Sequence, residues 1–312
     1  MKKLRLCLLI LTLVPFVWPA PPAAAQEASL DEASAYQAWF TANAANDLPQ
    51  ASDLAQAYLD KFPSGQYAEY LGKWLTGRRW SLFNEAIKKK DMAEMVRLGE
   101  ARLKQDPKDL TYLYWMALNL RQHELLAPSD VTHAKEAKDF SARAIELIDA
   151  GGQPAGVDAA KWNKDVNLAW LHQNLALLAA KEGNKDEALE HYELSSTLAP
   201  KDVGIQARNT LGCGAIYKDR YDEAVAKYQA LPGGERSAES PSAAATQPIG
   251  EANANADKAI DCWAHFLGVT RGAASEAVRS KMEATLAALY KYRHPDEPEG
   301  YKALVEKYAL AP

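Results

Sequence analysis

The chain has 312 residues, of which 48% are hydrophobic and 25% are charged, with 36 Lys and Arg against 41 Asp and Glu. This composition is typical of a globular protein with enough apolar residues to bury a substantial core. A formal charge of −5 without an extended basic cluster argues against a nucleic-acid-binding protein, because phosphate backbones attract Lys and Arg.

Residues 1–25 have the pattern of a secretory signal peptide. Three basic residues lie within the first five positions, an apolar run follows over residues 6–18, and three alanines precede Gln26. We expect cleavage between Ala25 and Gln26, and a periplasmic or secreted product. The alternative is an uncleaved anchor, but the run is shorter than the roughly 20 residues that span a bilayer. Cleavage leaves 33 basic against 41 acidic residues, a formal charge of −8, and no second run long enough to cross a membrane.

The chain that follows has the periodicity of helices. Apolar residues recur three and four positions apart, as they do over residues 66–90, and period-two alternation is almost absent. Prolines divide the helical segments at spacings of 44, 47 and 46 residues, which suit a helical hairpin with two turns; they are Pro63, Pro107, Pro154 and Pro200. The sequence therefore predicts an all-α protein built from helical hairpins.

The tripeptide Pro-Lys-Asp occurs twice at these divisions, at residues 107–109 and 200–202. Proline ends the preceding helix because it lacks an amide hydrogen. The aspartate can cap the next helix by accepting hydrogen bonds from its first free amides. Both tripeptides therefore predict a helix boundary.

Three segments repeat a small residue, an aliphatic residue and, four positions after the first, an aromatic residue. They are Ala188-Leu189 with Tyr192, Ala224-Val225 with Tyr228, and Ala259-Ile260 with Trp263, at spacings of 36 and 35 residues. In a helix the small residue permits close approach of a neighbouring helix, and the aromatic ring one turn later fills the remaining gap. The pattern predicts packing rather than catalysis.

Residues 169–231 resemble two tetratricopeptide repeats (TPRs). The family places Leu and a small residue in the first helix of each repeat, then Ala, an aromatic residue, a small residue and Pro in the second helix. The first copy has Leu175-Ala176, Ala188, Tyr192, Ser195 and Pro200, and the second has Leu211-Gly212, Ala224 and Tyr228. Both copies depart from the family at the favoured Trp position, which holds His172 and Arg208. The resemblance implies stacked antiparallel helical hairpins that form a TPR-like right-handed α-solenoid over residues 26–231. In each copy the implied second helix begins at an acidic pair, Asp186-Glu187 or Asp222-Glu223.

Residues 232–255 are rich in Gly, Ser, Ala and Pro and poor in large apolar residues. We expect a disordered insertion there, because such a segment buries too little apolar surface to offset the entropy of ordering. Residues 256–312 return to helical periodicity and predict a C-terminal helical repeat or cap.

Two cysteines follow the signal peptide, Cys213 and Cys262. An oxidising compartment favours a disulfide between them. The alternative is two separately buried thiols, because sequence spacing does not establish the short Cα separation that a disulfide requires.

The motifs of several catalytic and cofactor sites are missing. The sequence has no His-Glu-x-x-His zinc motif, no phosphate-binding Gly-Lys-Ser/Thr loop and no Gly-x-Ser-x-Gly elbow. We therefore expect no enzyme, no metal and no cofactor. Two alternatives stay open: an envelope enzyme or accessory helical domain acting on cell-wall glycan, and a protein that binds small molecules or glycans.

In the family that these repeats resemble, the first helices of successive repeats line a groove that holds a peptide or helix from a partner protein. The positions carried over to this chain are Trp170, Gln173, Leu177, Lys181, Gln206, Asn209, Cys213 and Tyr217. Their amides would bind the backbone of an extended peptide, and their aromatic rings would cover its apolar side chains. The alternative is that neighbouring repeats bury them. The function that we expect is a non-catalytic exported scaffold that binds a protein or peptide partner in the cell envelope.

Overall fold

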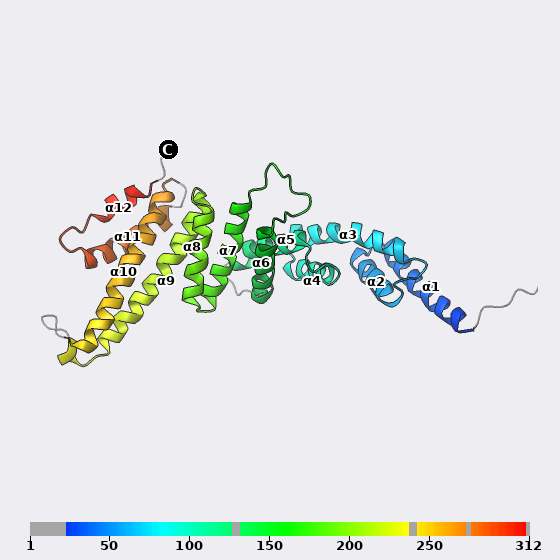
Figure 1. The fold of residues 1–312 in the computed structure, drawn as a ribbon, viewed down its shortest axis with the longest axis horizontal. Coiled ribbons are helices and arrows are strands. Elements are labelled where there is room, and N and C mark those ends of the chain that lie inside the picture. The colour runs from blue at the N-terminus through cyan, green and yellow to red at the C-terminus, as the bar shows by residue number, and fades with distance from the viewer. Residues whose placement is uncertain (1–22, 127–131, 237–241, 273–275, 310–312) are drawn as a thin grey trace, which may run out of the picture. The chain divides into compact units, whose positions relative to one another are not determined.

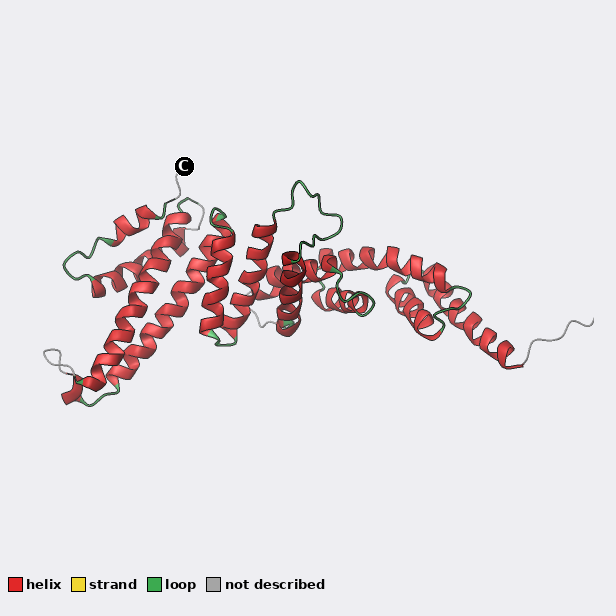
Figure 2. Cartoon of the chain, in the orientation of Figure 1, coloured by secondary structure: helices red, strands yellow, loops and turns green. Residues whose placement is uncertain are grey.

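The computed structural model describes residues 23–126, 132–236, 242–272 and 276–309, with side chains from residue 31 onward. Within these ranges the chain forms helices joined by turns, and no strand (Figures 1 and 2). The expected all-α class is confirmed. Most of the expected signal peptide, residues 1–22, lies outside the described residues, and Ala25 and Gln26 lie in the first described helix. None of the described helices combines the length and the hydropathy needed to span a bilayer.

The chain divides into two compact units, residues 1–84 and 85–312. The N-terminal unit contains α1 (Ala23–Ala44), α2 (Leu48–Lys61) and most of α3 (Ala68–Lys89). Its core includes Trp39, Tyr58, Leu71 and Leu75, none of which is more than 2% exposed. This unit therefore has a hydrophobic core of its own.

The C-terminal unit contains the end of α3 and all later elements. They are α4 (Met92–Leu103), α5 (Leu110–Leu120), a π-helix (Arg121–Leu125), α6 (Ala134–Asp149), α7 (Lys164–Lys181), α8 (Lys185–Leu198), α9 (Val203–Gln229), a short 3₁₀-helix (Gly233–Arg236), α10 (Ala243–Val269), α11 (Glu276–Arg293) and α12 (Tyr301–Lys307). From α4 to α10 each α-helix packs against the next one in the chain. The longest of these pairs is α9 with α10, which run side by side in Figure 1.

The two Pro-Lys-Asp tripeptides mark helix starts, as predicted. The Asp109 carboxylate caps α5 by accepting a hydrogen bond from the Thr111 amide at 3.1 Å. The Asp202 carboxylate caps α9 in the same way, from the Ile205 amide at 2.9 Å. Each aspartate satisfies an amide that has no partner within its own helix.

The second TPR-like copy is not a hairpin, and this expectation from the resemblance is wrong. A single helix, α9, runs for 27 residues through Asp222 and Glu223, where a second helix was expected to begin. In the first copy α7 ends at Lys181, and Gly183 follows the helix with a φ of +81°, a conformation that glycine adopts without steric cost. The position 36 residues later is Asp219. Without a glycine or proline there, the chain continues as one helix.

The expected disorder over residues 232–255 is also wrong for most of that segment. Residues 243–255 form the first half of α10, and residues 237–241 lie outside the described residues. Ser242 caps α10 by accepting a hydrogen bond from the Ala245 amide at 3.2 Å. Alanine has the strongest intrinsic helix propensity, and Ala245 and Ala252 are buried. Small side chains thus pack closely here without the large apolar residues that the prediction required.

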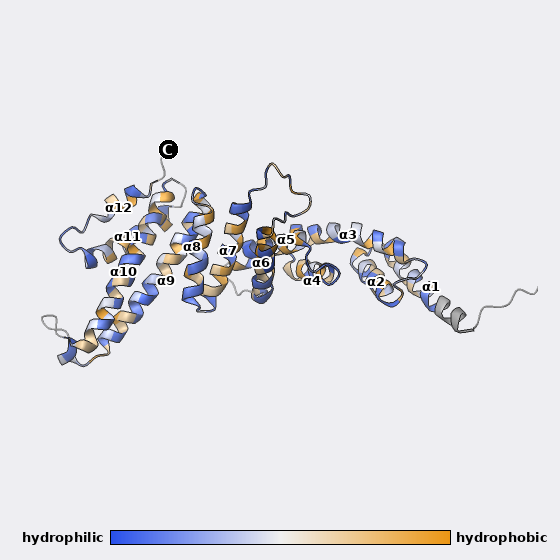
Figure 3. Cartoon of the chain, in the orientation of Figure 1, coloured by the Kyte–Doolittle hydropathy of each residue, from blue (hydrophilic) through white to orange (hydrophobic). Residues whose placement is uncertain are grey.

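Aromatic residues of the repeated small-aromatic pattern press onto glycines of α9. A Cβ atom on Gly212 would lie 2.5 Å from the Tyr192 ring of α8, and one on Gly214 would lie 2.3 Å from the Trp263 ring of α10. The small members of those two segments, Ala188 and Ala259, are fully buried. The close helix approach that the pattern predicts is therefore present on both sides of α9. Hydrophobic and hydrophilic residues alternate along α9 and α10 in Figure 3, as expected of helices with one buried face.

Candidate functional site

Helices α8, α9 and α10 enclose a cleft of about 440 Å³ in the C-terminal unit. Its α9 side is formed by Gln206, Asn209, Cys213 and Tyr217. These residues lie three or four positions apart, so they occupy one face of the helix. All four were predicted to line a partner groove, and the structure brings them to one surface.

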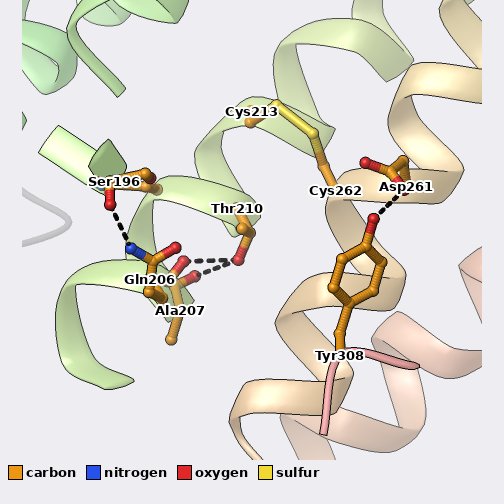
Figure 4. Close-up of a disulfide and its surroundings, with 9 residues drawn as sticks. Ser196, Gln206, Ala207, Thr210, Cys213, Asp261, Cys262 and Tyr308 are labelled. Carbon is orange, nitrogen blue, oxygen red and sulfur yellow. Dashed lines mark hydrogen bonds between the residues drawn. A yellow bond between two sulfur atoms is a disulfide. The ribbon is translucent and has the colours of Figure 1, made fainter. Parts of the chain in front are cut away.

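A disulfide between Cys213 of α9 and Cys262 of α10 forms part of the cleft wall (Figure 4). The two Cα atoms are 6.1 Å apart. Of the two alternatives left by the sequence, the structure has the disulfide. The disulfide joins the middle of α9 to α10. The segment that connects these two helices includes residues 237–241, which lie outside the described ranges.

The side-chain amide of Gln206 in this wall forms hydrogen bonds within the protein and is not available to a bound peptide backbone. Gln206 is 3% exposed, and its Nε2 donates to the carbonyl oxygens of Ser196 at 2.8 Å and Ala199 at 3.0 Å. These carbonyls belong to the end of α8, where no helical amide is available to them. The predicted peptide-binding role of the Gln206 amide is therefore wrong, because α8 already uses it.

The opposite side of the cleft carries negative charge. Glu190 and Glu193 of α8 are exposed, lie one turn apart and form no ion pair within the described part of the chain. Asp261 of α10 accepts a hydrogen bond from the hydroxyl of Tyr308 (Figure 4). The lining of the cleft thus includes carboxylates that a cationic group can approach.

The neighbouring ring of His265 adds little positive charge at neutral pH. It stacks on Tyr308 with the ring centroids 4.5 Å apart, and burial lowers the pKa of His265 below its usual value. Burial and the hydrogen bond to Asp261 raise the pKa of Tyr308 to about 12, so its hydroxyl stays protonated. The cleft is acidic near pH 7.

A buried polar chain lies behind the cleft. Arg121 Nη2 of the π-helix donates to Gln173 Oε1, Gln173 Nε2 donates to Asn209 Oδ1 at 2.5 Å, and Asn209 Nδ2 donates to Ser196 Oγ at 3.0 Å. Gln173 is fully buried and Asn209 is 1% exposed. Gln173 is therefore not accessible to a partner, contrary to the prediction, because neighbouring helices supply partners for both ends of its amide.

The other predicted groove residues lie elsewhere. The guanidinium of Arg121 lies 4.1 Å from the centroid of the Trp170 ring, which lines a second pocket. Leu177 is half-buried and Lys181 is exposed at the end of α7, and neither lines the cleft or the second pocket. The predicted residues therefore do not form one continuous groove: some line the cleft, Trp170 lines the second pocket, and the others line neither.

Two histidines meet between α7 and α8, beside the cleft. His172 Nδ1 and His191 Nδ1 are 3.2 Å apart, so one ring donates to the other only when at least one of them is neutral. Burial lowers the pKa of both histidines, and the charge of His191 lowers the pKa of His172 further. The charged groups that act on the pair are Asp149, Glu187 and Glu190, which favour protonation, and Lys138, which opposes it.

The free energy of unfolding should therefore fall as the pH drops below about 6.5, the ordinary pKa of histidine. Below that pH the unfolded chain takes up protons that the folded pair resists, so protonation favours unfolding. Urea unfolding between pH 5 and pH 8 measures this dependence. His191→Gln should flatten this pH dependence, because it removes one of the two histidines whose pKa burial lowers. Identical profiles for the wild type and His191→Gln would contradict the assignment.

Several residues of the two hollows were not predicted from the sequence. Glu190 and Glu193 have i, i+3 spacing, but exposed carboxylates are common on helices and carry no specific signal. Arg121 had a clearer signal in the sequence, since it follows the apolar segment Leu110–Leu120. A cation continuing such a segment is costly to bury unless it has a role or a partner.

Comparison with protein families and with curated proteins finds no match for this chain. Among the described residues, no three His, Cys, Asp or Glu side chains are grouped closely enough to hold a metal ion.

Proposed function

We propose that this protein is a non-catalytic, TPR-like scaffold of the cell envelope, and that the cleft between α8, α9 and α10 binds a peptide segment of a partner protein. The observation that carries the proposal is the cleft itself, which combines the partly exposed aromatic ring of Tyr217 with the free carboxylates of Glu190 and Glu193. Aromatic and charged groups around a concave surface are typical of peptide recognition. The sequential packing of α4 to α8 supports a solenoid of stacked hairpins as the scaffold.

The charge of the cleft defines the peptide chemistry that it suits. Carboxylates on α8 and α10 favour a Lys or Arg side chain, and the Tyr217 ring offers a face for an apolar or cationic group. The Tyr217 ring is compatible with a cationic neighbour, because the Lys258 Nζ atom lies 5.0 Å from its centroid. The preferred partner segment is therefore basic with neighbouring apolar residues, and its affinity should fall as salt concentration rises.

Selection of displayed random peptides on the processed protein tests this proposal. The enriched peptides should contain Lys or Arg beside aliphatic or aromatic residues. Tyr217→Ala should weaken the binding of a selected peptide about ten-fold, because it removes a partly exposed aromatic ring from the lining of the cleft. Glu190→Gln with Glu193→Gln should weaken it by a similar factor at low salt.

Tyr228→Ala is the matched control, because Tyr228 also lies on α9 but donates to the Arg236 carbonyl outside the cleft. It should leave the affinity for the peptide unchanged. Circular dichroism of each variant would establish that its helices are intact. Equal affinity of wild type and Tyr217→Ala, or enrichment of acidic peptides, would overturn the proposal.

A further inference from the structure

A second pocket, of about 390 Å³, lies in the C-terminal unit among the π-helix, α5, α7 and α9. It shares no lining residue with the cleft. Two arginines line it, Arg121 of the π-helix and Arg208 of α9, together with the indole of Trp170 and the side chains of Leu118 and Leu126. The pocket therefore combines two cations with apolar walls.

Arg121 is a buried cation that forms no ion pair with any of the described residues. Arg121 is 8% exposed. Within the described residues its side chain forms one hydrogen bond, to the neutral amide oxygen of Gln173, and its Nε is buried without a partner. Desolvating a guanidinium in this way is costly. Stacking on Trp170 offsets part of that cost through the cation–π interaction.

The lining of the pocket carries positive charge. Burial and the charge of Arg208 lower the pKa of Arg121 to about 10, so the Arg121 guanidinium is still a cation at neutral pH. Asp202 acts on Arg121 from beyond ion-pair distance, and its carboxylate already caps α9. An anion placed between the two guanidinium groups would relieve both the desolvation and the repulsion.

The backbone at Arg121 is also unusual. The residue begins a π-helix, a conformation that is rare and occurs often at functional sites. The Glu124 carboxylate in that turn accepts hydrogen bonds from the His133 amide at 2.9 Å and pairs with His133 Nδ1 at 2.6 Å. These contacts fix the turn from which Arg121 extends.

We propose that this pocket binds a small organic acid, with its carboxylate between Arg121 and Arg208 and its apolar body against Trp170 and the two leucines. A guanidinium pairs well with a planar carboxylate through two parallel hydrogen bonds. The pocket is several times larger than an inorganic phosphate or sulfate needs, and its apolar wall would gain nothing from those ions. The Tyr114 hydroxyl in the wall donates to Asn167, and burial raises its pKa to about 12, so it adds no competing negative charge. This inference does not depend on the proposed peptide-binding function.

Isothermal titration of the processed protein with phenylacetate and with octanoate tests the inference. At least one of these acids should bind with a Kd near or below about 1 mM, and the uncharged phenylacetamide should bind at least about ten-fold more weakly than phenylacetate. Arg208→Gln should weaken acid binding about ten-fold. Because Arg208 is exposed, this variant should fold normally.

Arg220→Gln is the matched control, since it removes the same charge from α9 at a residue that pairs with Asp186 outside the pocket. It should bind the acids as the wild type does. Trp170→Phe should lower the affinity of the protein for both acids without abolishing their binding. Failure of both acids to bind at about 10 mM, equal binding of phenylacetamide, unchanged binding by Arg208→Gln, or tighter binding of inorganic phosphate than of either acid would each overturn the inference.

Discussion

Replacing Cys213 and Cys262 by alanine is expected to lower the free energy of unfolding of the C-terminal unit by about 4 kcal/mol. The disulfide closes a loop between residues that are 49 positions apart. Opening it returns the loop-closure entropy to the unfolded chain, and that entropy grows with the logarithm of loop length. Denaturation in guanidinium chloride, followed by circular dichroism, measures the difference.

Reduction of the wild-type protein provides the internal control for this result. A dithiol reductant should shift the unfolding midpoint of the wild type toward that of the double alanine variant, and should leave the variant unaffected. Thiol titration of the denatured, unreduced protein should find no free thiol from this pair. Two free thiols in the chain, or equal stability of the two proteins, would contradict the disulfide.

The substitution Gly214→Ala is expected to cost about 1–3 kcal/mol of unfolding free energy, although it adds only one methyl group. The new Cβ would lie 2.3 Å from Trp263 Nε1, well inside the contact distance of any carbon and nitrogen. The Trp263 ring cannot move easily, because it is 4% exposed and belongs to a hydrophobic core cluster that includes residues of α10 and α11. The steric overlap can therefore be relieved only if α9 and α10 move apart. Urea unfolding of the variant measures the cost.

Gly250→Ala separates this packing effect from intrinsic helix propensity. Gly250 lies within α10, and a Cβ there would meet no atom within 4 Å. That change should stabilise the protein by about 0.5–1 kcal/mol, because alanine loses less backbone entropy on folding. Adding Trp263→Phe to Gly214→Ala should cost less than the sum of the two single changes, since the smaller ring makes room for the methyl group. Additive costs would show that the two residues do not compete for the same space.

Local signals in the sequence predicted much of the helical architecture. Apolar periodicity identifies helices because each must bury one face, and the Pro-Lys-Asp tripeptides placed the starts of α5 and α9 because capping depends on adjacent residues alone. The continuity of α9 could have been predicted from the missing glycine at Asp219. The first half of α10 was harder to predict, because its stability comes from alanines that pack against another helix.

The candidate sites depended on contacts that the sequence does not contain. The resemblance to tetratricopeptide repeats grouped Gln206, Asn209 and Tyr217, and all three line the cleft. It gave no information about which of these groups another helix would bind. Gln173 is buried because its amide meets Arg121, which precedes it by 52 residues. Periodicity assigns a residue to a face, but only the fold decides what covers that face.

The hydrogen bonds from Arg121 through Gln173 and Asn209 to Ser196 have a fixed direction. A guanidinium can only donate, so the Gln173 oxygen must face it, and the nitrogen of that amide must then face the Asn209 oxygen. Neither amide can rotate by half a turn without setting donor against donor. Side chains from the π-helix, α7 and α9 consequently have a single mutually compatible orientation, and a rearrangement at Arg121 must be concerted with the residues that reach the cleft.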